Sequence, residues 1–186
     1  MKTVKTKFKK FQYFYPYTVA LVGAQAENQT NFMSCAWHTA LSFDPPLFGV
    51  LIAKKRLTHQ LISSAREFTV NFLDMEQIKL SAQYGRKSGH DIAKIEEYPV
   101  KLLPSKIIKS PVIEEAYVSF ENKLVDTRTY GDHDLFVGQV LAIHEKKNCF
   151  DQEGILDPKA IRPLLYLGSD FYITTNPDTL DHVLPD

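Results

Sequence analysis

The sequence predicts a mainly β protein, an antiparallel barrel with helices added at its sides. About six or seven β-branched or alternating runs are interrupted by two or three amphipathic stretches. Strands and helices do not alternate regularly, and no Gly-x-Gly-x-x-Gly turn occurs, which disfavours a doubly wound dinucleotide-binding domain. An antiparallel barrel accommodates this pattern.

The first half of the chain is dominated by strands. Residues 17–24 are β-branched and apolar, and residues 31–42 resume as a strand that Asp44-Pro45-Pro46 ends, because proline cannot donate to a ladder. Residues 47–53 form a short, continuously apolar run that is typical of a central strand. A helix follows, with apolar residues at helical spacing at Leu57, Leu61, Ile62 and Ala65.

The second half continues the same pattern. Residues 67–73 alternate as a half-buried strand, Asp74 is placed to cap a helix that runs to about residue 84, and residues 92–97 form a short helix. The two longest strand candidates are residues 116–130 and 135–147. Residues 100–113 are expected to be loop with short strands, and the tail to hold one strand, at 164–167 or 171–174.

The composition favours one domain over residues 1–186, with its core at about 15–172. The 186 residues are 44% hydrophobic and 24% charged, which is ordinary for a globular protein. The formal net charge is zero, so we expect no nucleic-acid partner, and weak self-repulsion permits an oligomer. No run reaches the ~20 apolar residues of a membrane span.

The cysteine usage indicates a reducing compartment. Cys35 and Cys149 are the only two cysteines and lie far apart, so they offer neither a disulfide framework nor metal-ligand spacing. The lysine-rich start of the chain, followed by Ala24-Gln25-Ala26, imitates a secretory signal. Pro16 and three tyrosines interrupt the apolar region that such a signal needs. We therefore expect a cytoplasmic protein without a membrane partner.

A first candidate site lies where the strand 47–53 gives way to a helix. The helix N-terminus offers free N–H groups and partial positive charge, Arg56 can grip a phosphate, and the Thr58 hydroxyl can donate to it. Lys54 and Lys55 add charge. The alternative is an ordinary charged helix start with Thr58 as a local cap.

A second candidate is the run of small residues Ser34, Cys35 and Ala36 before Trp37. Small side chains let a flat ring or a phosphate approach the backbone N–H groups. The alternative is a buried strand in which Trp37 anchors the core. No activating base is evident for Cys35, although His38 is close, so we do not interpret this cysteine as a nucleophile.

His133 is the third candidate, expected on an exposed turn. It stands between Asp132 and Asp134 after Gly131, and two carboxylates favour its protonated form, which suits proton delivery. The alternative is a surface turn in which Asp and Gly provide the bend. The remaining histidines show no metal-ligand spacing, so no metal site is expected; they are His38, His59, His90, His144 and His182.

The loop Arg86-Lys87-Ser88-Gly89-His90-Asp91 is the last candidate. Its charge and mobility suit a lid over an anionic ligand, or it is a solvated connection.

Together these segments resemble the flavin reductase-like proteins with an FMN-binding split barrel, a group that includes flavoredoxins. The resemblance covers residues 15 to 172 and rests on eight motifs in the family's order. They are Tyr15-Pro16-Tyr17-Thr18-Val19-Ala20-Leu21-Val22-Gly23, Asn31-Phe32-Met33-Ser34-Cys35-Ala36-Trp37, Asp44-Pro45-Pro46, Arg56-Leu57-Thr58, Phe68-Thr69-Val70-Asn71, Ser88-Gly89-His90-Asp91, Gly131-Asp132-His133-Asp134-Leu135-Phe136-Val137-Gly138 and Pro163-Leu164-Leu165-Tyr166-Leu167-Gly168.

The resemblance implies a six-stranded antiparallel split barrel that forms a homodimer, with FMN near the dimer interface. The implied cofactor-binding residues are Met33, Ser34, Cys35, Ala36, Trp37, Ala53, Lys54, Arg56, Thr58, Asn71, Ser88 and Gly89. Residues 53–58 would hold the phosphate, and His133 would lie near the reactive face of the flavin as the catalytic residue. The chain departs from the family pattern at His90, where Arg is common, and at Lys54 and Lys55, where Ser or Pro is common.

The activity that this resemblance implies is electron transfer from NADH or NADPH through FMN to free flavin or a downstream acceptor. The alternative is a flavoredoxin-like carrier with tightly held FMN, no nicotinamide site and a redox partner protein. A further alternative is a barrel that binds no flavin, with a structural or haem-binding role.

Overall fold

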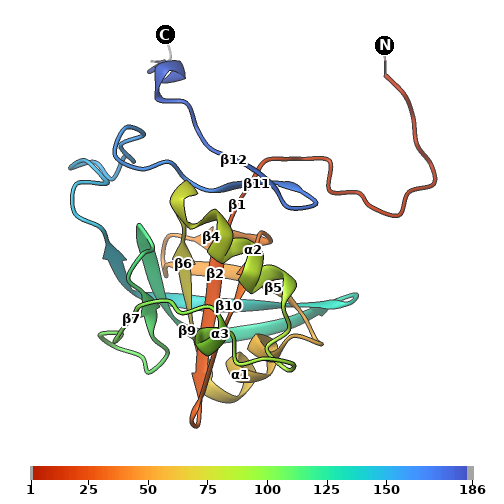
Figure 1. Ribbon diagram of the computed structural model, residues 1–186, viewed down its shortest axis with the longest axis vertical. Helices are drawn as coiled ribbons and strands as arrows, with labels where there is room; N and C mark the ends of the chain where they lie inside the picture. The colour runs from red at the N-terminus through yellow and green to blue at the C-terminus, as the bar shows by residue number, and fades with distance from the viewer. Residues whose placement is uncertain (1, 184–186) are drawn as a thin grey trace.

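The computed structural model describes residues 2–183 and places a seven-stranded antiparallel sheet at its centre (Figure 1). The strands of this sheet follow the order β3-β2-β6-β9-β10-β5-β4. In chain order they are β2 (Ala20–Ala26), β3 (Gln29–Cys35), β4 (His38–Ser42), β5 (Leu47–Ala53), β6 (Glu67–Phe72), β9 (Val118–Tyr130) and β10 (His133–Glu145).

The sheet curls into a barrel because its two edge strands, β3 and β4, are consecutive in the chain. Only Ala36 and Trp37 separate them. The Leu51 amide of β5 donates to the Trp37 carbonyl at 2.9 Å, which brings this corner onto β5. The single strand predicted over residues 31–42 is thus divided in two. Counted as one bent strand, β3 and β4 give the six strands of the predicted split barrel, so the predicted fold class is confirmed.

Apolar side chains from alternate strand positions fill the barrel. Helix α1 (Leu57–Ala65) lies against β2 and β3 and adds Leu57, Leu61 and Ile62 to this core. The helix predicted from apolar spacing is therefore confirmed, and each of these buried side chains stabilises the fold by roughly 1.5–3 kcal/mol. The strands contribute Ala20, Val22, Met33, Cys35, Val50, Ile52, Phe68, Val70 and Phe136.

Helix α2 (Ile78–Arg86) covers the outer face of β2 and β3 (Figure 1). It follows a 3₁₀ turn, η1 (Met75–Gln77), for which Asp74 is the cap: its carboxylate accepts from the Glu76 amide at 3.0 Å. The predicted cap is confirmed, although the first turn is 3₁₀ rather than α. A second apolar cluster, which includes Leu21, Phe32, Tyr84 and Ile113, fills the space between this helix and the sheet.

Short elements surround the barrel. They are β1 (Tyr17–Thr18), α3 (Lys94–Glu97), β7 (Leu102–Leu103), β8 (Val112–Ile113), β11 (Leu165–Gly168), β12 (Phe171–Ile173) and η2 (Pro177–Thr179). Strands β1, β11 and β12 form a small sheet of their own, so both candidate strands of the tail are present. The segment before β1 extends away from the barrel (Figure 1). Within residues 2–183, no helix is long and apolar enough to cross a bilayer.

Candidate functional site

The side chains of strand β3 alternate between its outer face, where Phe32 and Ser34 lie, and the barrel core. The Ser34 hydroxyl donates to the Ser81 carbonyl of α2 at 2.5 Å, and Ser34 and Ala36 line a cleft of about 260 Å³. Met33 and Cys35 point into the barrel core, because side chains alternate along a strand. Of the predicted flavin-binding stretch, Met33 and Cys35 can therefore reach the outside only through their backbone.

The Cys35 thiol is buried in the barrel core and is expected to be unreactive. Burial raises the pKa of its thiol to about 12, although the Sγ atom donates to the carbonyls of Trp37 and Leu51 at 3.4 Å and 3.8 Å. The reactive thiolate does not form near neutral pH with such a pKa. The geometry agrees with the interpretation of Cys35 as a structural residue.

The cleft beside Ser34 and Ala36, here called the β3 cleft, carries positive charge. Arg56, the residue before α1, and Arg86, the last residue of α2, line it. The Arg86 Nε atom donates to Asp170 at 2.7 Å, whereas no carboxylate of residues 2–183 forms an ion pair with Arg56. Tyr166, Asp170 and Tyr172 of the C-terminal segment also line the cleft. The cleft therefore offers one uncompensated guanidinium beside small side chains.

A second compartment, here called the aromatic pocket, adjoins the first at Ala36, which lines both. Its volume is about 530 Å³, and no Lys, Arg, Asp or Glu lines it. The Trp37 ring lies in its wall, with its centroid 6.2 Å from that of Phe11 in the N-terminal segment. A polar, cationic cleft and an apolar pocket thus meet at one alanine.

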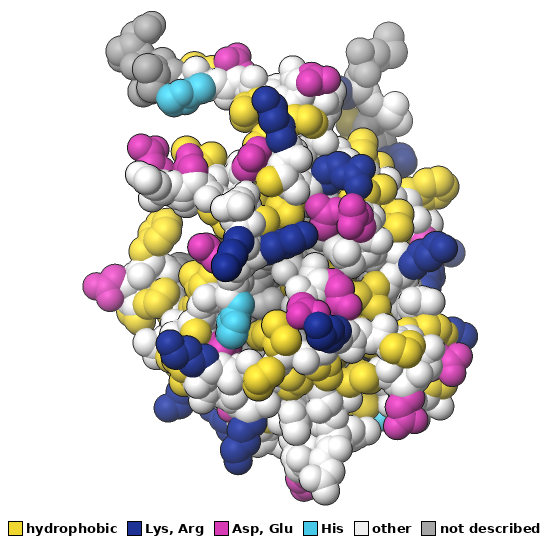
Figure 2. Space-filling view, turned by 60° about the vertical axis from the view of Figure 1, so that its left-hand side comes forward, with side chains coloured by type: hydrophobic (Ala, Val, Ile, Leu, Met, Phe, Trp, Pro, Cys, Tyr) yellow, Lys and Arg dark blue, Asp and Glu magenta, His cyan; other side chains and the backbone are white. Residues whose placement is uncertain are grey.

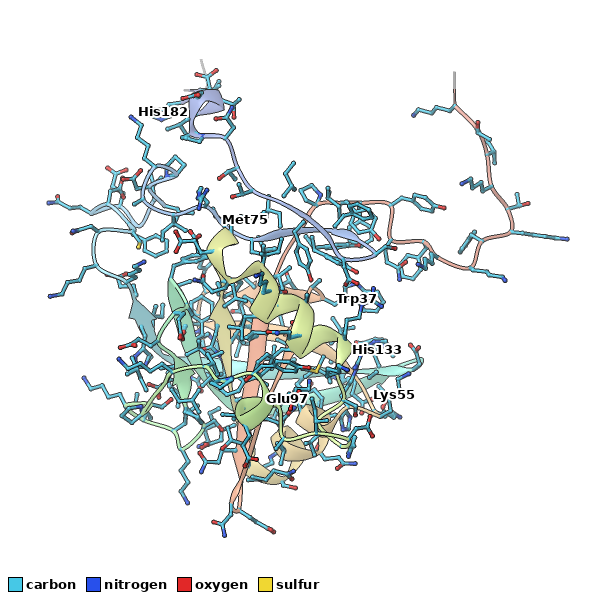
Figure 3. The ribbon with its side chains drawn as sticks, in the orientation of Figure 1. Trp37, Lys55, Met75, Glu97, His133 and His182 are labelled. Atoms are coloured by element: carbon cyan, nitrogen blue, oxygen red, sulfur yellow. The ribbon has the colours of Figure 1, made fainter. Side chains whose placement is uncertain are left out.

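The sequence suggested an exposed turn for His133, but the structure places this residue in a strand. Gly131, at φ +61°, and Asp132 form the turn, and His133 is the first residue of β10. Its side chain is 23% exposed, its Nδ1 atom lies 2.7 Å from an Asp132 oxygen, and its ring lies 4.9 Å from the Trp37 ring. Figure 3 shows Trp37, His133 and Lys55 along one side of the barrel. The histidine therefore packs against Trp37, which lines the aromatic pocket, but does not itself line that pocket.

Asp134 does not join His133 but supports the start of α1. Its Oδ2 atom lies 2.7 Å from His59 Nε2, and its Oδ1 atom lies 3.7 Å from Lys54 Nζ. The hydrogen bond from His59 holds the pKa of Asp134 below its usual range. Ala53 pairs with His133 across β5 and β10, so the predicted phosphate segment and the predicted catalytic residue are neighbours.

Thr58 and the Ser88-Gly89 loop meet at the first turn of α1. Thr58 is fully buried, and its hydroxyl accepts from the Asn31 side chain at 2.7 Å. Gly89 lies so close that a Cβ atom there would stand 2.5 Å from Asn31 Oδ1 and 2.8 Å from a Leu57 methyl carbon. The fold therefore unites the predicted phosphate segment with the loop that was predicted to cover an anionic ligand, but the Thr58 hydroxyl already has a protein partner.

Lys94 and Tyr172 line the cavities described here but were not predicted as site residues from the sequence. Lys94 is the charged one of the two. It lines a cavity of about 290 Å³ together with Asn31, Leu57 and Gly89, here called the Lys94 pocket. Its side chain is buried, and Nζ donates to the carbonyls of Phe32 at 3.2 Å and Tyr84 at 2.8 Å. Burial, with a smaller contribution from Arg56, lowers the pKa of Lys94 to about 8. A lysine in a polar stretch gives no sequence signal of this burial.

Asn71 lies apart from these compartments. It is buried on the outer face of β6, where its amide nitrogen donates to the Leu21 carbonyl and its oxygen accepts from the Ile113 amide, each at 2.9 Å. It lines none of the three cavities described above. The predicted contact of Asn71 with a flavin stays a prediction. Both polar atoms of its side chain already have protein partners.

The fold and its cavities define a class: antiparallel split barrels with clefts along the outside of an edge strand. Comparison with known families agrees, since the model of the flavin reductase like domain matches residues 12–175. The chain belongs to the flavin reductase-like family.

Two solved structures are similar to this chain over nearly its whole length, and a relative is similar over about three quarters of it. An FMN-binding protein from Thermus thermophilus, solved with bound 1-cyclohex-2-enone, has a TM-score of 0.88 at 34% identity and covers 98% of this chain and 100% of its own. Flavoredoxin from Methanosarcina acetivorans has a TM-score of 0.84 at 25% identity, over 100% and 95% of the two chains. A protein of unknown function from Pyrococcus abyssi is 38% identical over 76% of this chain and 81% of its own.

Proposed function

We propose that this protein is an FMN-binding oxidoreductase of the flavin reductase type, which passes electrons from NADH or NADPH through FMN to free flavin or a downstream acceptor. The observation that carries the proposal is the meeting of the β3 cleft and the aromatic pocket at Ala36. FMN has the same division, with a flat ring at one end and a phosphate at the other. The FMN-binding relative from Thermus supports this choice of cofactor.

The residues present fit such a ligand. Ser34 and Ala36 line the cleft and are small enough for a ring or a ribityl chain to lie against β3. Arg56 and Lys94 are two cations without a carboxylate partner among residues 2–183, and a phosphate would neutralise them. FMN, when bound, would supply the two-electron chemistry.

The protein's own side chains would bind FMN, orient it and shield its ring from water. The uncharged walls of the aromatic pocket exclude water from the ring. His133 packs against Trp37 of this pocket, and Asp132 holds its Nδ1 atom. The Nε2 atom is then the one that would hold or deliver a proton.

A second function, a flavoredoxin-like carrier that takes electrons from a redox partner protein, is favoured by one observation. The aromatic pocket has no lysine or arginine in its lining, so it offers no counter-charge to the phosphates of a nicotinamide dinucleotide. A relative of this kind, flavoredoxin from Methanosarcina acetivorans, shares the fold.

We further propose that the protein acts as a homodimer in the cytoplasm. Large apolar side chains are exposed, among them Phe43 at the β4–β5 turn with 100% and Ile143 of β10 with 60%, and such surface is often covered by a partner. Figure 2 shows charges of both signs interspersed over one face, which does not oppose self-association. Both cysteines are buried and unpaired, in keeping with a reducing compartment.

The test is the visible spectrum of the purified protein, followed without oxygen as NADH and then NADPH are added. A flavin band near ~450 nm that bleaches with either nucleotide supports the reductase. A flavin band that bleaches only with a strong chemical reductant favours the carrier. A colourless protein that takes up no added FMN contradicts both.

A further inference from the structure

We propose that the segment of residues 2–14, here called the N-terminal arm, is the docking surface for an acidic electron-carrier protein that exchanges electrons with the bound FMN. This role rests on the proposed flavin function and adds the charge of the partner and its point of contact. Electrons lost by one redox centre are gained by the other, so the partner must dock beside the flavin site. The charge, the exposure and the position of the arm support this role.

The arm concentrates positive charge that the rest of the chain balances. Five of the 22 basic residues precede Glu27, and no acidic residue does. The chain from Glu27 onward therefore holds more acidic than basic residues, although the formal net charge of the whole is zero. A local field of one sign steers a partner of opposite charge and raises its association rate about 10- to 1,000-fold. The lysines of the arm are Lys2, Lys5, Lys7, Lys9 and Lys10.

The charged and aromatic side chains of the arm are available to a partner. All five lysines are exposed, and none of them forms an ion pair with a carboxylate of residues 2–183. Large exposed rings alternate with and follow the lysines. Such rings supply most of the contact energy in protein interfaces, and the charges set the orientation of the partner. The exposed rings are those of Phe8, Phe11, Tyr13 and Phe14.

The arm reaches the mouth of the proposed flavin site. It extends away from the barrel (Figure 1), but Phe11 and Phe14 line the aromatic pocket together with Trp37. The Phe11 ring centroid lies 6.2 Å from that of Trp37. Lys5 turns back toward this end of the arm, because its Nζ atom donates to the Tyr13 hydroxyl at 3.4 Å and lies 5.2 Å from the Tyr13 ring centroid. A carrier held by the arm would therefore face the aromatic pocket.

Two other partners compete for a basic, aromatic segment. An anionic membrane attracts lysines and aromatic rings in the same way, but membrane docking does not require the segment to lie beside the aromatic pocket. A second copy of this chain would need a groove for the rings with acidic residues around it. The apolar groove that Phe120, Ile143 and Phe150 line has Glu145 as its one acidic residue among those that the structure describes. One carboxylate does not match five lysines.

The experiment compares two variants of the full chain that lose the same charge. In the arm variant, all five lysines of the arm are replaced by glutamine. In the control variant, five exposed lysines outside the arm are replaced in the same way. Because both variants lose five positive charges, they differ only in where the charge was. The replaced residues of the control are Lys106, Lys109, Lys146, Lys147 and Lys159.

The probe is a purified plant-type ferredoxin, a small acidic carrier with a [2Fe–2S] cluster. Reduced ferredoxin is mixed without oxygen with each FMN-loaded protein, and the bleaching of the flavin gives the rate. The anisotropy of labelled, oxidised ferredoxin gives the Kd. At ~20 mM salt we expect the arm variant to lower the rate and raise the Kd about tenfold or more, and the control variant to change each less than about threefold. At ~500 mM salt, which screens exposed charges, the three proteins should agree within about twofold.

Several results would overturn the proposal. Equal effects of the two variants, or no effect of either, would show that the position of the arm charge is irrelevant. Weaker binding of the arm variant to phosphatidylserine vesicles, with an unchanged ferredoxin rate, would assign the arm to a membrane surface. A lower molar mass of the arm variant by light scattering would make the arm an interface between copies. A wild type that takes up no FMN removes the proposed flavin function, and the ferredoxin Kd then still tests the arm by itself.

Discussion

Two regions of the protein place polar groups in the interior, but they differ in the partners of those groups. One is the outer face of β6 and β9. The other, here called the rim of β3, consists of Arg56 and Lys94 beside the β3 cleft and the Lys94 pocket. On β9, the Glu121 carboxylate accepts from the amides of Lys106, Ile107 and Ile108 at 2.7 to 3.1 Å. On β6, Glu67 accepts from the amide of Ser110 at 2.8 Å. These carboxylates hold the segment that covers them, and they leave nothing for a ligand.

The rim of β3 is the opposite case. Arg56 and the buried Lys94 have no carboxylate partner within residues 2–183, and both border cavities. A buried polar group whose partners are all supplied by the protein maintains structure. A buried charged group that has no oppositely charged protein partner and lies beside a cavity indicates a binding site. Asn71 belongs with the first kind, since its amide is fully used.

Removal of the Glu121 carboxylate should have the largest effect. In Glu121→Ala, three partly buried backbone amides lose their acceptor, and we expect the free energy of unfolding to fall by about 3 kcal/mol, measured by urea denaturation. The Kd ratio of FMN to riboflavin should not change. Glu97, exposed on α3, provides the control: Glu97→Ala should stay within about 0.5 kcal/mol of the wild type. A changed flavin ratio in Glu121→Ala would show that the two regions are coupled.

A bulky side chain at the junction of the two compartments should block the flavin. Ala36→Phe would fill the point where the β3 cleft and the aromatic pocket meet, and we expect both FMN and riboflavin to bind at least about tenfold more weakly. The matched control is Ala40→Phe on the exposed part of β4. Unchanged binding in Ala36→Phe would mean that the flavin lies elsewhere.

The smallest expected effect concerns the thiols. Burial raises the pKa of Cys35 to about 12 and also raises that of Cys149, so neither should react with an aromatic disulfide reagent at pH 8 while the protein is folded. Both should react after unfolding in guanidinium. Rapid reaction of a single thiol in the native protein would indicate that the interior of the barrel opens at β3.

The sequence predicted the elements that depend on local signals. The apolar spacing of α1 and the cap at Asp74 are local, and the structure confirms both. The break at Ala36 and Trp37 gave no signal, because the run from β3 into β4 is continuously strand-like and only the closure of the barrel bends it. His133 was misplaced for a related reason: pairing with β5 extends β10 toward the turn.

The candidate site was predictable only in part. Ser34, Ala36 and Arg56 come from short motifs, and the fold places them in one cleft. Lys94 and Tyr172 reach the site through contacts between segments distant in sequence, and no spacing rule within one segment encodes such contacts. Sequence patterns therefore identified the strand β3 that borders the site, but not the residues that distant segments of the chain bring to it.

Hydrogen exchange of the backbone amides, with and without FMN, tests most directly which region binds the ligand. We predict that FMN binds at the rim of β3 and not at the outer face of β6 and β9. Saturating FMN should slow exchange along β3, at the first turn of α1 and over residues 88–94. Exchange over residues 105–113, which Glu67 and Glu121 hold, should stay the same. Protection confined to residues 105–113, or none anywhere, would contradict the assignment of the flavin site to the rim of β3.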